Sequence, residues 1–158
     1  MHVVSKRPAA SDAPGVIATL SPLLKRDIEG IACWYDNAIV LAGSLAPLSE
    51  LSDSTGRRRT LVLTDGTNQE PVGLMLIALD DPEPGWATVN QLAIARQEER
   101  DMAALGIALL ETGLGQEATR IRAAVPADVG LALYFWLRLG YRPIAAGGRL
   151  WMIRDLDA

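Results

Sequence analysis

Apolar positions change their spacing near the middle of the chain, and the change divides it into two parts. Over about 11–50 the apolar residues recur three or four positions apart, as on one face of a helix. Over about 60–155 short runs of alternating or continuous apolar residues are separated by turn residues, as in strands. The pattern therefore predicts a helical segment followed by a sheet-forming region, with one short strand over 2–7 ahead of both.

The helical segment has a start signal at Ser11-Asp12-Ala13-Pro14, where a capping residue precedes an early proline. Apolar residues then follow at helical spacing in two stretches: Val16, Ile17, Leu20, Leu23 and Leu24, then Ile28, Ile31, Ala32, Tyr35, Ile39 and Val40. We expect helices over 12–24 and 27–42, with internal boundaries that the pattern does not define.

Three strands are expected next, over 60–64, 71–79 and 86–95. Asp65-Gly66 heads the first connection, and the second, over 80–85, is rich in Asp, Pro and Gly. Because both connections are short, consecutive strands must run in opposite directions. The three strands are therefore predicted to form an antiparallel meander.

The last third of the chain returns to helical spacing and then closes with strands. The predicted elements are a helix over 102–116, a strand over 119–125, a helix from the cap Asp128 to about Leu139, ended by Gly140, and a hairpin of 141–145 and 149–154 split by Gly147-Gly148. The whole order predicts a single α/β domain over 1–158, with one mixed, mostly antiparallel sheet flanked by helices.

Composition excludes several function classes. Apolar residues make up 49% and charged residues 22% of the 158 residues, as in folded globular chains. The net charge of −4 argues against a nucleic-acid partner, and no apolar run is long enough to span a membrane. His2 and Cys33 are the only residues of their types, so we expect no metal site, no internal disulfide and a cytoplasmic location.

Three segments carry a family pattern. Residues 89–94 end in Leu-Ala-Ile, residues 118–122 enter a strand, and residues 137–141 close a helix with Leu-Gly-Tyr. In this order they resemble the GNAT acyltransferases, which transfer an acyl group from coenzyme A, most often to an amine. The resemblance extends from about Val3 to Arg154 and implies a GNAT-like fold, with acetyl-CoA or another acyl-CoA as co-substrate.

The resemblance also implies where coenzyme A binds. Its pantetheine arm is expected to pair with the strand backbone at Leu92, Ala93 and Ile94, with the N–H of Ile94 next to the thioester carbonyl. Its pyrophosphate is expected at the start of the following helix, where unpaired backbone N–H groups and the helix dipole favour negative charge.

Two alignments of the phosphate loop compete. The first puts Arg100 at the family's Arg/Gln position and places Ala103 and Leu105 where small residues are usual. The second uses Gly106 and Ala108 as the small residues, with a longer loop and a shorter helix. Bulky Leu105 fits the pattern poorly. The candidate phosphate-binding residues are Arg100, Met102, Ala103, Ala104, Leu105 and Gly106.

The catalytic positions depart further from the family. Trp136 stands where many members have a tyrosine that protonates the leaving thiolate, so it is expected near the thioester, yet an indole is no useful acid. Tyr134 lies two residues away, on another helix face. The strand over 86–95 offers only Thr88, Asn90 and Gln91 as polar residues, none of them a general base.

The leading hypothesis is an acyl-CoA-dependent N-acyltransferase that acts on a small-molecule or peptide amine. The alternative is a GNAT-like binding or regulatory module that has lost catalysis and still holds coenzyme A. An assembly role through the apolar stretch over 16–51, with a homodimer as one form, is a third hypothesis.

Overall fold

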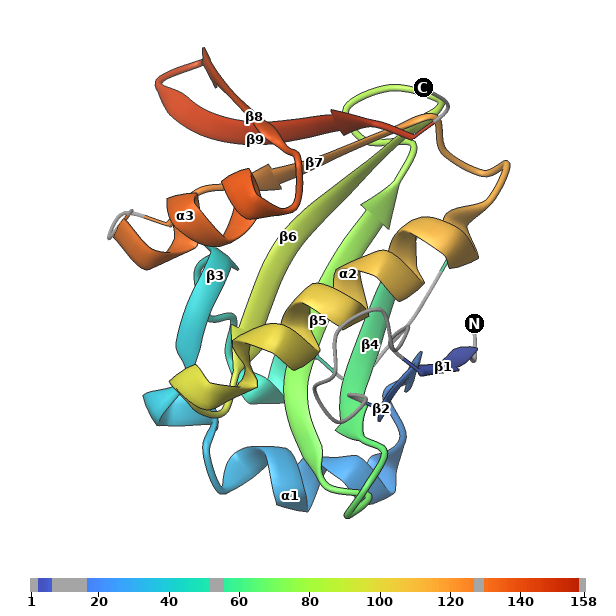
Figure 1. Cartoon of the computed structure of the whole chain (residues 1–158), viewed down its shortest axis with the longest axis vertical. Helices are drawn as coiled ribbons and strands as arrows, with labels where there is room; N and C mark the ends of the chain where they lie inside the picture. Colours follow the sequence, from blue (N-terminus) through green and yellow to red (C-terminus); the bar gives the residue numbers. More distant parts are fainter. Residues whose placement is uncertain (1–2, 7–16, 52–55, 127–129, 157–158) are drawn as a thin grey trace.

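A computed structural model describes residues 3–6, 17–51, 56–126 and 130–156 of the chain. These residues form one sheet of nine strands in the order β1-β2-β4-β5-β6-β7-β9-β8, with β3 paired to β6 outside that path (Figure 1). Only β6 and β7 pair in parallel. The strands are β1 (Val3–Lys6), β2 (Ile17–Pro22), β3 (Ile39–Gly43), β4 (Arg58–Asp65), β5 (Pro71–Leu79), β6 (Trp86–Ile94), β7 (Arg120–Ala124), β8 (Arg142–Ala146) and β9 (Arg149–Asp155).

Three α-helices cover the sheet from its two sides: α1 (Ile28–Ala32), α2 (Arg100–Leu114) and α3 (Gly130–Arg138). Helices α2 and α3 lie over the same face of the sheet, and α1 packs against the other face at β5 (Figure 1). The larger core, under α2 and α3, contains Leu63, Ile107 and Trp136, and the smaller core contains Ile31, Val62 and Leu74. The structure therefore confirms a single α/β domain with a mostly antiparallel sheet.

The second half of the chain folds as its pattern predicted. The meander appears as β4, β5 and β6, and the following helix, strand, helix and hairpin appear as α2, β7, α3, β8 and β9. Gly140, Gly147 and Gly148 have φ angles of 89°, 61° and 75°, which side-chain-bearing residues rarely adopt, so glycine is needed at these ends and turns. Asp128, the expected cap of α3, lies outside the described residues.

The prediction of a helical segment over about 11–50 is wrong for residues 17–22 and 39–43. Residues 17–22 form strand β2, which pairs with β1 and β4, and residues 39–43 form strand β3, which pairs with β6. Helix α1 keeps only five residues of the segment. Pairing with distant strands overrides the local helical spacing. Ala18 and Leu20 are two positions apart, so in a strand they lie on the same face, and both are fully buried there. The expected start signal at 11–14 lies outside the described residues.

Candidate active-site groove

The edge of β6 that faces β7 changes its partner half-way along the strand. The parallel β6–β7 ladder extends from Trp86–Arg120 to Val89–Ala123 and stops there. The other edge of β6 pairs with β5 throughout, except that the register shifts so that Asn90 has no partner opposite it. Asn90 is thus a bulged residue, next to the last residue of β6 that pairs with β7. Beyond this point the two strands diverge (Figure 1).

Strand β3 occupies the edge of β6 that β7 leaves. Ile39 pairs with Ile94, Val40 with Ala93, Ala42 with Leu92 and Gly43 with Gln91, in antiparallel orientation. The side chains of Leu41 and Ala42 are fully buried. The segment 91–94 is therefore paired on both sides by strands of the same chain, and Leu92, Ala93 and Ile94 have no free ladder edge in this arrangement.

Gly43 ends β3 in contact with the bulge. Its φ angle is +65°, and a Cβ built on it would lie 1.8 Å from the carbonyl oxygen of Asn90. No side chain can be accommodated at that distance, so the close approach of β3 to β6 at this point depends on glycine.

We call the stretch beside residues 91–94 of β6, which β7 leaves and β3 fills, the groove. Trp136 contacts β3 there and has a structural role. Its side chain is fully buried, and its indole N–H donates a 2.7 Å hydrogen bond to the carbonyl oxygen of Leu41. The ring also packs edge-on against Phe135 and Tyr141, with centroids 5.2 and 4.8 Å away. Trp136 therefore joins α3 to β3, while Tyr134 on the same helix is 55% exposed.

Tyr141 is held by a charged pair on the α2 side. Its hydroxyl donates to Glu111 at 2.7 Å, and Glu111 also pairs with Arg154 at 3.1 Å. Burial, together with the negative charge of Glu111, raises the pKa of the Tyr141 hydroxyl. A group that keeps its proton so firmly is a structural donor, not a proton source near neutral pH.

The polar side chains of β6 are mostly engaged in structural contacts. Gln91 is buried, donates to the Tyr35 hydroxyl at 3.0 Å and accepts from the Ala46 N–H at 2.8 Å. Thr88 is buried too, and its hydroxyl donates to the carbonyl oxygen of Asp81. Asn90 alone is exposed. The pairing of Gln91 with Tyr35 was missed from the sequence, which carries no signal linking residues 56 positions apart.

The start of α2, the expected phosphate site, carries acidic residues. Glu98 and Asp101 are exposed, and Glu99 is buried against Arg96, whose guanidinium it contacts at 2.7 Å. That hydrogen bond and charge raise the pKa of Arg96. Arg100 begins the helix and donates its Nε–H to the backbone of the preceding turn. Because carboxylates repel a pyrophosphate, this helix end offers backbone donors in an unfavourable electrostatic setting.

The other candidate phosphate residues divide between the core and the helix surface. Ala103 and Gly106 are buried toward the sheet, and a Cβ on Gly106 would lie 3.0 Å from Leu63. Leu105 is partly buried and packs against the larger core, as do Met102 and Ala104. The helix starts at Arg100, so the loop of the second alignment falls within α2. The positions of the first alignment, from Arg100 to Leu105, lie within α2 as well, so the choice between the two alignments stays a prediction.

Coenzyme A does not fit the groove in this arrangement. An added strand needs free N–H and C=O groups along β6, and β3 takes those groups at 91–94. The buried Leu41 and Ala42 fill the space beside α3, and acidic residues surround the start of α2. Binding of the arm at this edge therefore requires β3 to move.

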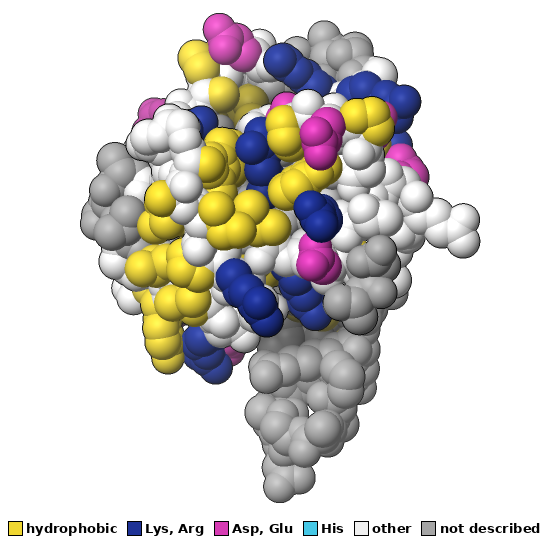
Figure 2. Space-filling view, turned by 90° about the horizontal axis from the view of Figure 1, so that it is seen from above, with side chains coloured by type: hydrophobic (Ala, Val, Ile, Leu, Met, Phe, Trp, Pro, Cys, Tyr) yellow, Lys and Arg dark blue, Asp and Glu magenta, His cyan; other side chains and the backbone are white. Residues whose placement is uncertain are grey.

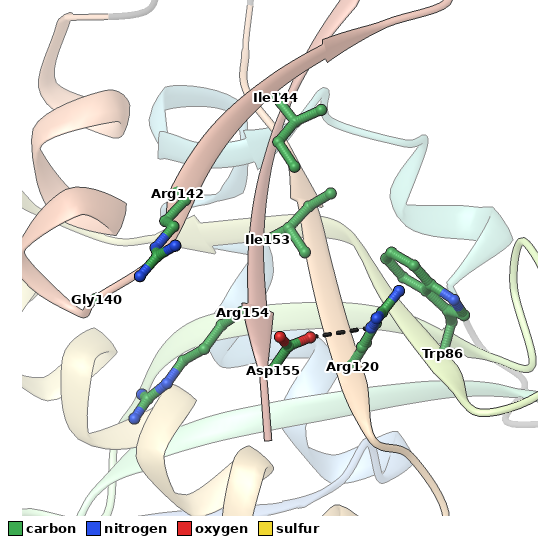
Figure 3. Close-up of a pocket in the computed structure, with 8 residues that line it drawn as sticks. All are labelled: Trp86, Arg120, Gly140, Arg142, Ile144, Ile153, Arg154 and Asp155. Carbon is green, nitrogen blue, oxygen red and sulfur yellow. Dashed lines mark ion pairs between the residues drawn. The ribbon is translucent and has the colours of Figure 1, made fainter. Parts of the chain in front are cut away.

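A separate basic pocket lies at the opposite end of β6 and β7. It encloses about 510 Å³ and is lined by Trp86, Arg120, Gly140, Arg142, Ile144, Ile153, Arg154 and Asp155. Figure 3 shows the Arg120–Asp155 ion pair beside the Trp86 ring, with the Arg142 and Arg154 side chains turned away from it. Figure 2 shows apolar and basic side chains interleaved over the end of the molecule formed by the last strands. Apart from the paired Asp155, the charged side chains that line this pocket are arginines.

The described residues contain no group of three or more His, Cys, Asp or Glu side chains placed to hold a metal ion. No helix among them has the length and apolar content needed to cross a membrane.

Comparison with known proteins places the fold. No protein-family model and no curated protein match the chain. Among solved structures, an acetyltransferase from Thermus thermophilus is 26% identical, with a TM-score of 0.64 over 87% of this chain and 96% of that chain. The GNAT domain of PAT from S. lividans is 14% identical, with a TM-score of 0.67 over 98% and 96%. The spermidine N-acetyltransferase SpeG from Vibrio cholerae is 15% identical, with a TM-score of 0.66 over 89% and 94%.

The described strands form a mostly antiparallel sheet with one parallel pair, β6 and β7, and the chain shares its fold with these acetyltransferases. The GNAT-like fold implied by the resemblance in the sequence is therefore confirmed.

Proposed function

We propose that the protein is an N-acyltransferase that takes an acyl group, acetyl in the simplest case, from acyl-CoA and transfers it to an amine. The observation that carries this proposal is the similarity to the Thermus thermophilus acetyltransferase, which covers 96% of that chain. The divergence of β7 from β6 after Val89 supports it, because β7 does not use the β6 edge beyond that residue, and an extended co-substrate could pair there once β3 leaves it.

In this proposal Leu92, Ala93 and Ile94 supply the backbone edge for the pantetheine arm, and the start of α2 at Arg100 supplies donors for the pyrophosphate. The acceptor is a small-molecule or peptide amine. With no general base among the polar residues of β6, rate enhancement would come from positioning a deprotonated amine and polarising the thioester carbonyl. Residues Met102 to Gly106 would contribute mainly through their helix, because most of their side chains face the core.

A cytoplasmic location is part of the same proposal. Cys33 is exposed and unpaired, which suits a reducing compartment. A homodimer is kept as a proposal for its assembly, which light scattering measures directly.

The test is release of free thiol from acetyl-CoA in the presence of a panel of amines, measured against a heat-inactivated control. It should be run on the wild-type chain and on Gly43→Ala, which weakens the contact that closes the groove. Turnover by either form supports the proposal. Absence of turnover in both, together with no calorimetric binding of acetyl-CoA at millimolar concentration, would contradict it.

A second candidate function is a GNAT-like module without catalysis, and the pairing of β3 with β6 is the observation that favours it. Such a module would give no thiol release in any form tested. Amine-dependent turnover above the control would exclude it.

A further inference from the structure

Strand β3 is short and lies beside β6 where β7 has left it, and apart from its pairing with β6 it contacts helix α3 and strand β7. Among the described strands it pairs only with β6, and its five residues include a register shift between Val40 and Ala42. Ile39 and Val40 are only partly buried. A short, irregular edge strand of this kind is easier to remove than a strand with two neighbours.

Three further contacts hold β3 in the groove. The Trp136 indole donates to Leu41, the Gln91 side chain accepts from Ala46 just after the strand, and Gly43 lies against Asn90. Leu41 and Ala42 supply the buried apolar part. The closed arrangement therefore depends on a small set of named contacts, each of which exists only while β3 is in place.

The backbone groups that β3 uses are those that an extended amide-bearing arm would need. An arm and β3 cannot pair with 91–94 on the same edge at the same time, because each N–H and C=O on that edge makes one ladder bond. Occupation of the edge is thus a competition between a segment of the chain and the co-substrate.

We propose that β3 is a self-inhibitory strand that occupies the acyl-CoA edge of β6 and must leave it before acyl-CoA binds. This inference rests on the proposed function and names how the same site is regulated. Gly43 and Trp136 are the positioning residues of the closed form. Because only the open form binds, the apparent affinity for acyl-CoA is reduced by the small fraction of molecules that are open.

A reversible cross-link tests the proposal most directly. In a Cys33→Ser background, Val40→Cys with Ala93→Cys places two thiols at directly opposed positions of β3 and β6, a spacing that a disulfide can bridge. We expect calorimetric binding of acetyl-CoA to be lost in the oxidised form and regained on reduction. The matched control is Ala145→Cys with Leu150→Cys, an opposed pair on β8 and β9, for which oxidation should change nothing.

Weakening the closed form gives the opposite effect. Gly43→Ala puts a methyl group where only 1.8 Å is available beside Asn90, and this clash exists only while β3 is paired. We expect at least a tenfold tighter apparent Kd for acetyl-CoA. Gly148→Ala is the control, because Gly148 also has a positive φ, of 75°, but has no atom within 4 Å of the added Cβ.

Hydrogen exchange supplies a readout that does not depend on turnover. Added acetyl-CoA should speed exchange of the amides of β3 while those of β6 stay protected. Slower exchange in β3 on binding would overturn the proposal, since it would mean that β3 stays in the groove.

The outcomes separate the two proposals. Equal binding by the oxidised and reduced cross-link variants overturns the self-inhibitory strand and leaves the N-acyltransferase standing. If no form binds acetyl-CoA, including the reduced variant and Gly43→Ala, both proposals fail. Should Gly43→Ala not fold, the cross-link comparison still decides.

Discussion

The indole N–H of Trp136 and the carbonyl oxygen of Leu41, 95 residues apart in the chain, form a buried hydrogen bond of 2.7 Å. This bond joins the helix that carries the family's catalytic position to the strand that fills the groove. It gives Trp136 a structural role at the position that the resemblance aligns with a tyrosine acid of many GNAT members.

Replacing Trp136 with phenylalanine should destabilise the protein. The variant leaves the Leu41 carbonyl without its donor in a dry environment, which costs about 1–3 kcal/mol in the free energy of unfolding. Urea denaturation measures the loss. Trp34→Phe is the matched control, because the Trp34 indole donates to Pro71 at 3.0 Å in a partly exposed position. An equal or larger loss in the control would contradict the role given to Trp136.

Neutralising the acidic start of α2 should favour coenzyme A. Glu98→Gln with Asp101→Asn removes two exposed charges from the helix end where a pyrophosphate would bind. Each charge near a helix N-terminus contributes about 0.3–1 kcal/mol, so removing two should raise the affinity of the Gly43→Ala form for acetyl-CoA roughly three- to thirtyfold at low salt.

The control for this charge change is Glu29→Gln with Asp36→Asn, which removes two exposed charges around α1. A similar gain in the control would mean that overall charge, and not the start of α2, governs the affinity.

Tyr141 should make stability fall at alkaline pH. Its pKa is raised in the folded protein by burial and by Glu111, whereas in the unfolded chain it ionises near 10.0. Below that pH both the folded and the unfolded state keep the proton, and the Tyr141 hydroxyl makes its full contribution to the free energy of unfolding. Above it only the unfolded state loses the proton, so the free energy of unfolding drops by up to about 1.4 kcal/mol per pH unit.

Urea titrations from pH 8 to 11 measure this slope, because they extend about one pH unit or more to each side of 10.0, where the unfolded tyrosine ionises. Tyr141→Phe should reduce the alkaline slope, and Tyr134→Phe, which changes an exposed ring on α3, should not. An unchanged slope in Tyr141→Phe would show that this hydroxyl does not control alkaline stability.

Gln91→Leu should cost about 2 kcal/mol or more, because it leaves the Ala46 N–H and the Tyr35 hydroxyl without the side chain that they contact. Thermal and urea unfolding report the change. The neighbouring Asn90→Leu alters an exposed residue and should stay within about 0.5 kcal/mol. Equal losses in the free energy of unfolding for Gln91→Leu and Asn90→Leu would contradict the structural role given to the Gln91 side chain.

The second half of the chain could be predicted because its signals are local. Short turns at 65–69 and 80–85 join consecutive strands, and the glycines at 140, 147 and 148 stand where positive φ angles are needed. Counting along a helix placed Trp136 near the thioester, and that placement stays a prediction. The hydrogen-bond partner of its indole could not be predicted, because nothing near Trp136 in sequence identifies Leu41.

By itself, the sequence determined the meander, α2 and the closing hairpin, since these depend on periodicity and turn chemistry within a few residues. Tertiary structure decided that residues 17–22 and 39–43 are strands and not helices, because pairing with β4 and β6 outweighs a weak local preference. It also decided that β3 fills the groove beside β6. Whether the edge of β6 is open or filled depends on contacts among β3, α3 and the bulge at Asn90, which meet only in the folded chain.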